Sequence, residues 1–403
     1  MNVSSPTVSA TPTVIRPLTA LLLLWLAGVA LRLTILAVPP VIPLIHDDLH
    51  MSETQVGVLS GIPMVLFAGA AIAGSLMVAR LGAVNALLTG LALCAVGSVV
   101  RGVGPHLAML YFGTVVTAFG VAVMQPALPL LVRTWVPRRI GFATAVYTNG
   151  LIVGEIFPAA LTIPLVLPML HRSWQWSFVF WAFWVAVIAA MIFAMAPKQQ
   201  AQASSAAATP QGWMPDFTNP LIWRIGLLLG SVNATYFSLN GFLPDYLTHT
   251  GQADLINAAL TANNACQLPA SFMLLMSAER LVRTYWSYIV CALMCAAGLL
   301  MITLLHGGWV IAGAAVLGCF AAAVLVLILA LPPLISPPDE VHRVSAGMFT
   351  ISYSLAVIVP IVSGVLWDLT GWLLAPFIPM GLCMAAVIGL APSIVLREKS
   401  AGA

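Results

Sequence analysis

Two charged residues lie deep inside apolar stretches of the sequence. Arg32 interrupts the run that begins near Leu18 and continues to Ile45, and Glu155 lies in the middle of the apolar run over residues 140–167. A guanidinium offers a planar set of donors that suits a small oxyanion or carboxylate. A carboxylate can bind donors, neutralise a cation or carry a proton. These two side chains are therefore the first candidates for binding and proton chemistry.

The composition indicates which solvent surrounds most of the chain. Hydrophobic residues make up 61% of the 403 residues and charged residues only 7%, whereas soluble domains carry about 25% charged residues. Apolar runs of about 20 residues or more can cross a hydrocarbon core about 30 Å thick. Backbone groups in lipid must be bonded within a helix or a closed barrel, and strand-like alternation is missing. We therefore predict an all-α membrane protein.

Twelve apolar runs predict twelve transmembrane helices. The predicted spans cover residues 18–45, 54–79, 83–103, 107–132, 140–167, 176–196, 221–247, 254–277, 284–305, 308–331, 344–367 and 371–395. An Ala/Gln/Ser-rich stretch at 198–212 predicts a linker between the sixth and seventh spans. The predicted organisation is a tail (1–17), a six-helix bundle (18–196), a linker (197–220), a second six-helix bundle (221–396) and a tail (397–403).

The basic residues predict how the chain is oriented. If the spans alternate, twelve of the fifteen Lys and Arg residues fall on one side, Arg101 and Arg172 fall on the other, and Arg32 lies within the bilayer. The positive-inside rule then places both termini in the cytoplasm. The formal net charge of +3 is thus a topology signal and does not indicate a nucleic-acid partner.

Several kinds of site are not indicated by the sequence. The six cysteines lie within apolar spans without a CxxC pair, so neither a disulfide framework nor a metal site is predicted. Walker, GxSxG, HExxH and GxGxxG motifs are absent, which argues against ATP-driven pumping and against an intramembrane hydrolase. We predict no cofactor and no enzymatic activity.

The two predicted halves show a faint internal repeat. LALCAVG at 91–97 aligns with ALMCAAG at 292–298, so Cys94 matches Cys295 and Gly97 matches Gly298. Twelve helices with cytoplasmic termini, a central linker and two related halves are typical of the major facilitator architecture. In that architecture two pseudo-symmetric six-helix bundles enclose a substrate site near the membrane midplane.

Four stretches along the chain resemble one branch of that superfamily, the cyanate permease family, which also contains nitroimidazole transporters. They are LRLTILAVPP (31–40), QPALPLLVRTWVPRRIGFATAVYT (125–148), SWQWSFVFWA (173–182) and SAGMFTISYSLAVIVPIVSGVLWDLTGW (345–372). The sequence departs from the family pattern at Ala30, where the family usually has asparagine, and at Glu155, where a small residue is usual. The resemblance implies a monomeric transporter of a bacterial inner membrane.

Arg32 has two interpretations. Holding it in mid-bilayer costs at least roughly 2.5–3.5 kcal/mol, so something must offset that cost. It either lines a cavity and binds an anionic substrate, or it forms a permanent ion pair that fixes helix packing. We favour the first, because intramembrane charges are functional by default and the family resemblance agrees. Glu155 is the natural partner, as a counter-ion, as a proton-coupling group or as a direct ligand of the substrate.

Polar side chains in other spans complete the predicted substrate site. Asn233, Tyr236 and Asn240 share one face of the span at 221–247, Tyr353 lies in the span at 344–367, and Gln125 lies in the span at 107–132. The competing interpretation is that these groups only bond one helix to another, which such residues commonly do in membranes.

The predicted function is secondary active transport by alternating access. The favoured substrate is a cyanate-like or other small anionic or polar solute, with proton coupling left open. One alternative is proton-coupled efflux of nitroimidazole-like or other small drugs, and another is a non-transporting membrane sensor.

Overall fold

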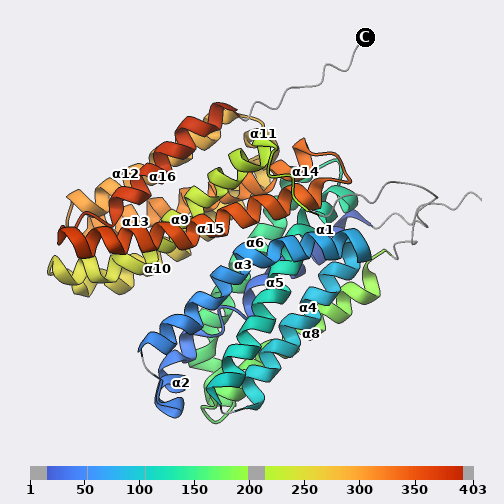
Figure 1. Ribbon diagram of the computed structural model, residues 1–403, viewed down its shortest axis with the longest axis horizontal. Helices are drawn as coiled ribbons and strands as arrows, with labels where there is room; N and C mark the ends of the chain where they lie inside the picture. The colour runs from blue at the N-terminus through green and yellow to red at the C-terminus, as the bar shows by residue number, and fades with distance from the viewer. Residues whose placement is uncertain (1–15, 52, 105, 198–213, 394–403) are drawn as a thin grey trace, which may run out of the picture.

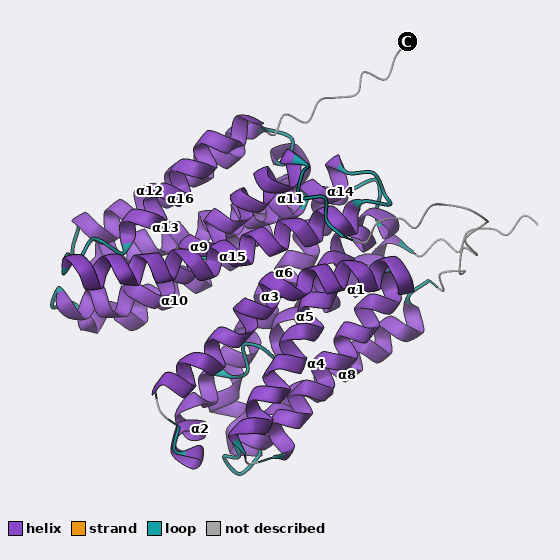
Figure 2. Ribbon diagram, in the orientation of Figure 1, coloured by secondary structure: helices purple, strands orange, loops and turns teal. Residues whose placement is uncertain are grey.

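The computed structural model describes residues 16–51, 53–104, 106–197 and 214–393, and within these ranges the chain is helical, with short loops and no strand (Figure 2). The predicted tail at 397–403, most of the tail at 1–17 and most of the linker at 197–220 lie outside the described residues. Figure 1 shows two bundles that meet where α6, α11 and α14 lie and diverge towards α2 and α10.

Each bundle is built from consecutive helices. The first contains α1 (Pro17–Leu33), α2 (Ile42–Leu49), α3 (Glu53–Leu81), α4 (Ala83–Val103), α5 (Leu107–Trp135), α6 (Ile140–Leu161), α7 (Leu167–Met169) and α8 (Trp174–Met195), with η1 (Pro39–Val41) and a π-helical segment η2 (Thr162–Val166). The second contains α9 (Pro220–His249), α10 (Ile256–Ala265), α11 (Gln267–Leu281), α12 (Tyr285–Leu304), α13 (Gly308–Leu329), α14 (Leu331–Ile335), α15 (Val341–Thr370) and α16 (Phe377–Leu390), with η3 (Ala253–Leu255) and η4 (Ala391–Ser393).

The helices lie in the regions of the twelve predicted spans, although some of these spans are broken. Among the described residues, eight helical segments are long and apolar enough to cross a membrane, and α1 and the segment Phe377–Ser393 are apolar but shorter. The 30-residue α9 and the pair α10 and α11, broken at Cys266, occupy the remaining two spans. Large apolar side chains such as Phe193 (78% exposed) and Met276 (93% exposed) lie on the outside, as a lipid-facing surface requires.

The prediction of one continuous helix over 18–45 is wrong. α1 ends at Leu33, residues 34–38 form turns, and the chain continues through the 3₁₀ turn η1 into α2. Pro39 and Pro40 have no backbone N–H, so they cannot donate the hydrogen bonds that would continue the helix. The break begins at Thr34, two residues after Arg32, and leaves backbone carbonyls of this turn available to other donors.

The faint sequence repeat corresponds to the same contact in both bundles. A Cβ atom on Gly97 of α4 would lie 2.7 Å from the carbonyl oxygen of Gly113 on α5. A Cβ on Gly298 of α12 would likewise lie 2.7 Å from the carbonyl oxygen of Gly313 on α13. Each glycine pair therefore lets two helix backbones touch, and the two halves share this construction.

Cross-bundle hydrogen bonds close one side of the molecule, which we call the closed side. Arg133 at the end of α5 donates through Nη1 to the carbonyl oxygen of Pro333 at 2.8 Å and also to that of Ser336, both at α14. The backbone N–H of Phe142 on α6 donates to Oε1 of Glu279 on α11 at 3.0 Å. The opposite side, where α2 and α10 lie, is called the open side.

Close packing of α1 against α6 sets the position of Arg32. Added Cβ atoms would lie 2.0 Å from the Tyr147 carbonyl oxygen at Gly28, 2.2 Å from the Trp25 carbonyl oxygen at Gly150, and 2.2 Å from the Val29 carbonyl oxygen at Gly154. Side chains at these three positions would therefore force the two helices apart.

We expect Gly154→Ala to destabilise the protein by about 1–3 kcal/mol, because the new methyl group would clash with the α1 backbone. The matched control is Gly69→Ala on α3, where an added Cβ meets nothing within 4 Å. Thermal unfolding of both purified variants measures the difference. Equal melting temperatures for the two variants would contradict the close contact between α1 and α6.

Candidate functional site

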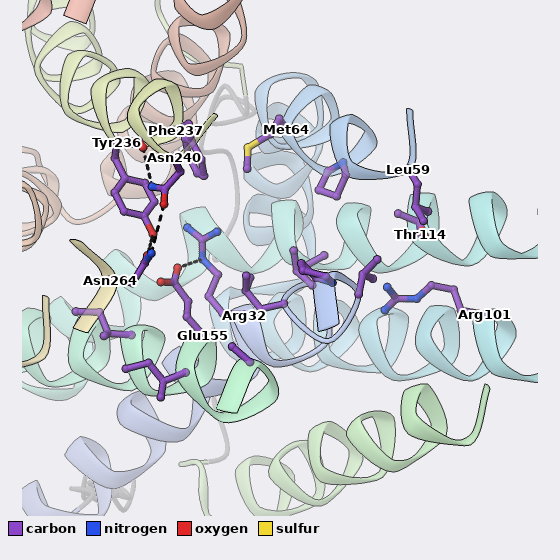
Figure 3. A pocket seen from close by; sticks show the side chains of 18 residues that line it. Arg32, Leu59, Met64, Arg101, Thr114, Glu155, Tyr236, Phe237, Asn240 and Asn264 are labelled. Atoms are coloured by element: carbon purple, nitrogen blue, oxygen red, sulfur yellow. Dashed lines mark hydrogen bonds and ion pairs between the residues drawn. The ribbon is translucent and has the colours of Figure 1, made fainter. Parts of the chain in front are cut away.

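An ion pair between α1 and α6 lies at the centre of the molecule. Nε of Arg32, in the last turn of α1, is 3.3 Å from Oε1 of Glu155 on α6. Their side chains are only 13% and 19% exposed, and both line a cavity of about 500 Å³ between the bundles. Figure 3 shows the two terminal nitrogens of Arg32 directed away from Glu155. The pair is thus largely but not fully buried, and it faces a space large enough for a solute.

The cavity extends from this ion pair towards the open side. Its walls are mostly apolar, and the first bundle supplies the larger share of them. The lining residues are Arg32, Ile35, Leu36, Val38, Pro39, Leu59, Pro63, Met64, Arg101, Thr114, Ile152, Glu155, Ile156, Ala159, Tyr236, Phe237, Asn240 and Asn264. An apolar cavity with a few convergent polar groups is the common form of a small-molecule site.

The second bundle supplies a neutral polar cluster to the same cavity. The Tyr236 hydroxyl donates to Oδ1 of Asn264, whose amide nitrogen donates to Oδ1 of Asn240 at 3.3 Å (Figure 3). The Asn240 amide donates to the Tyr236 carbonyl oxygen at 2.8 Å, and Gln267 donates to the Tyr236 hydroxyl at 3.3 Å. These bonds fix the orientation of the amides that face the cavity.

The other predicted site residues lie in a different space. Arg32 also lines a small cavity of about 30 Å³, together with Gln125, Asn233 and Tyr353. The Gln125 amide donates to the Tyr353 hydroxyl at 3.0 Å and so connects the two bundles. The Asn233 amide donates to the Ser352 hydroxyl at 2.9 Å, within the second bundle. Arg32 is therefore the one predicted site residue that lies against both spaces.

Three polar residues of the larger cavity were not among the predicted site residues: Asn264, Arg101 and Thr114. Asn264 lies in the cavity wall. Arg101 was placed on a membrane surface, but it is 0% exposed and lies in the same wall. The signal for Arg101 was its position inside the predicted span 83–103, two residues before the end of that span.

Comparison with known families decides the class of protein. The family model described as Major Facilitator Superfamily matches residues 24–260. The chain belongs to this superfamily. The predicted fold, two related six-helix bundles in an all-helical membrane protein, is the fold of that superfamily, and the prediction is confirmed.

Relatives by sequence come from the branch that the sequence resembles. The chain is 26% identical over 369 residues to the uncharacterized transporter YycB of Bacillus subtilis (strain 168), covering 89% of this chain and 88% of YycB. It is 26% identical to the cyanate transport protein CynX and 23% identical to a 2-nitroimidazole transporter, both of Escherichia coli (strain K12). These two alignments cover 60% and 56% of this chain, and 62% and 56% of the relatives. The predicted membership in this branch is confirmed.

Solved structures of the superfamily share the fold. The major facilitator transporter FucP, in the outward conformation, aligns with a TM-score of 0.75 at 16% identity and covers 93% of this chain and 98% of its own. The proton:xylose symporter XylE, bound to 6-bromo-6-deoxy-D-glucose, aligns with a TM-score of 0.73 at 13% identity and covers 94% and 96%.

We expect the ion pair to behave as a unit in stability measurements. Arg32→Gln alone leaves the Glu155 carboxylate buried without its partner, which costs up to about 3–5 kcal/mol. Combining Arg32→Gln with Glu155→Gln removes both charges and should recover most of that loss. Melting temperatures of the wild type, the two single variants and the double variant give the coupling. Strictly additive effects would mean that the two charges do not interact.

Proposed function

We propose that this protein is a secondary transporter that carries a small anion across a bacterial inner membrane by alternating access. The single observation that supports this most is the Arg32 guanidinium, which lies between the bundles and faces a solute-sized cavity. A fixed cation in a low-dielectric cavity attracts an anion strongly. The relative CynX, named as a cyanate transport protein, agrees with a small planar anion as substrate.

The proposed orientation makes this conformation ready for uptake. The closed side carries Arg133 and Glu279, together with the ends of the spans that the positive-inside rule assigns to the cytoplasm. The cavity then faces outward. An anion that enters it would bind Arg32, and the Tyr236, Asn240 and Asn264 cluster would contact the anion as the second bundle closes over it. The Arg133 and Glu279 contacts would break as the closed side opens.

Glu155 is proposed as the proton-coupling group as well as the counter-ion. Oε1 of its carboxylate is 3.3 Å from Nε of Arg32. An incoming anion competes with Glu155 for the same guanidinium. A carboxylate that loses its partner in a closed cavity is costly unless it takes up a proton. One anion and one proton would then leave the occupied site with the same net charge as the empty one, and the bundles could close over it.

A second candidate is efflux of a small nitroaromatic drug. The relative named as a 2-nitroimidazole transporter supports it, and so does the cavity, which has mostly apolar walls and a volume of about 500 Å³. A triatomic anion fills little of such a volume, whereas a heterocycle with a nitro group could contact the apolar walls and Arg32 together.

Counterflow in proteoliposomes distinguishes these proposals. Vesicles loaded with one unlabelled compound from a panel of small anions, amides and nitroheterocycles are assayed for uptake of the same labelled compound. Accelerated exchange of small anions supports the first proposal, and exchange confined to nitroheterocycles supports the second. Absence of exchange across the whole panel would contradict both and favour a non-transporting role such as a sensor.

We expect Arg32→Lys to insert and fold but to bind its anion at least about tenfold more weakly, on the order of 1.4 kcal/mol, since lysine keeps the charge and loses the planar fork. Arg32→Ala should abolish binding. Arg224→Lys, at an exposed position on α9, is the matched control and should bind like the wild type. Ligand affinity and melting temperature are measured on the same samples. Unchanged affinity in Arg32→Ala would assign the arginine to packing alone.

We expect Glu155→Gln to abolish accumulation driven by a pH gradient while leaving exchange of substrate intact, because exchange returns a loaded carrier without a deprotonation step. Uptake with and without an imposed gradient, in parallel with counterflow, measures the two activities. Asp254→Asn, an exposed carboxylate on η3, serves as the control. Gradient-driven accumulation at the wild-type level in Glu155→Gln would exclude Glu155 as the coupling group.

A further inference from the structure

A second arginine lies buried in the first bundle, away from the ion pair. Arg101 on α4 is 0% exposed, and none of the ion pairs in the described part of the chain includes it. Its Nη2 donates to the carbonyl oxygen of Thr34 at 3.0 Å and to the Ser98 hydroxyl at 3.3 Å. The ring of Phe178 lies 4.8 Å from its guanidinium carbon. These contacts hold the side chain in place but supply no negative charge.

Three buried donors at this point have no acceptor. Nε and Nη1 of Arg101 are both without a hydrogen-bond partner, and so is the hydroxyl of Thr34. The neighbouring hydroxyl protons are already used: the Ser98 hydroxyl donates to the Phe178 carbonyl oxygen at 3.0 Å, and the Thr114 hydroxyl donates to that of Leu110 at 2.7 Å. Among the described residues, no acceptor lies within hydrogen-bond reach of Nε or Nη1 of Arg101. Buried unpaired donors on a charged group are costly, which indicates that something else accepts their hydrogen bonds.

The position of Arg101 determines where such an acceptor could come from. Arg101 and Thr114 line the same cavity as Arg32. Figure 3 shows the Arg101 guanidinium directed towards the part of the cavity where Arg32 lies. The break in α1 exposes the Thr34 carbonyl that fixes this orientation. A solute in the cavity would therefore lie against the wall that contains Arg101 as well as the ion pair, although the Arg101 side chain is itself 0% exposed in this conformation.

We propose that Arg101 and Thr34 form a second binding site, for a small monovalent anion, separate from Arg32 and Glu155. The three unpaired groups are all donors, and the site carries a single positive charge without a carboxylate. One negative charge on a compact ion, a halide or a small oxyanion, matches this arrangement. A phosphate or a larger dianion would leave charge uncompensated against the Phe178 ring. The site itself does not depend on which solute the protein transports.

The alternative assigns Arg101 a structural role only. In that case its bond to the Thr34 carbonyl stabilises the broken turn of α1, and no anion is bound. Both roles predict that loss of Arg101 lowers stability, so a drop in melting temperature does not separate them. A saturable response to the concentration of an anion does separate them, because a ligand that binds only the folded state raises its stability.

Bromide titration of the full-length protein in detergent tests the proposal. The background carries Arg32→Gln with Glu155→Gln, so that Arg101 is the remaining arginine in the cavity wall. Sodium bromide replaces sodium gluconate at constant ionic strength, and the melting temperature is followed. We expect a saturable rise in this background, no saturable rise after adding Arg101→Gln, and a midpoint at least about threefold higher after adding Thr34→Val.

Thr144→Val is the matched control for Thr34→Val. Its hydroxyl is also buried and unpaired, but it lies on α6 and lines neither cavity. The bromide midpoint of this control should equal that of the background. A background without a saturable rise, a rise that persists after Arg101→Gln, or equal midpoint shifts for the two threonine variants would each overturn the proposal. If Arg101→Gln does not fold, the two threonine variants decide the outcome.

Discussion

The constraint that shapes this structure is the cost of an ionised side chain inside a membrane. Arg32 is tolerated because Glu155 lies 3.3 Å away on a different helix. That distance requires α1 and α6 to approach until their backbones nearly touch, which Gly28, Gly150 and Gly154 allow. The ion pair thus requires α1 and α6 to pack closely, and this close packing requires glycine at the contact positions. Because the charges face a cavity, water or a solute can share in their solvation.

The two bundles contribute different chemistry to that cavity. The first supplies its three charged residues, Arg32, Arg101 and Glu155, whereas the second supplies the neutral groups of Tyr236, Asn240 and Asn264. Neutral groups can approach a bound ion and be desolvated at lower cost than charged ones. In the proposed transport cycle, the second bundle would therefore close over a bound ion without bringing a charge of its own into the cavity. The bond from Gln125 to Tyr353 connects the two bundles beside the smaller cavity, which Arg32 also lines.

Much of this arrangement could be predicted from the sequence, because charges and spans are visible in an apolar background. Arg32 and Glu155 are conspicuous in their apolar spans. The repeat that aligns Cys94 with Cys295 also corresponds to a shared contact, because each thiol donates to a carbonyl oxygen of the following long helix. The break after Leu33 could not be inferred, since membrane helices often tolerate proline. Arg101 lies so near the end of its span that a surface position was equally consistent. Whether Asn264 faces a helix or a cavity depends on contacts between distant segments.

On the closed side, the donor and the acceptors of one cross-bundle contact respond differently to mutation. Arg133 donates to the carbonyl oxygens of Pro333 and Ser336, which belong to the main chain. Substitutions at residues 333 and 336 change side chains and leave those acceptors in place, whereas any replacement of Arg133 removes the donor. This contact therefore depends on the identity of the side chain only at residue 133. On the α14 side it depends on the path of the backbone, so different side chains there are compatible with it.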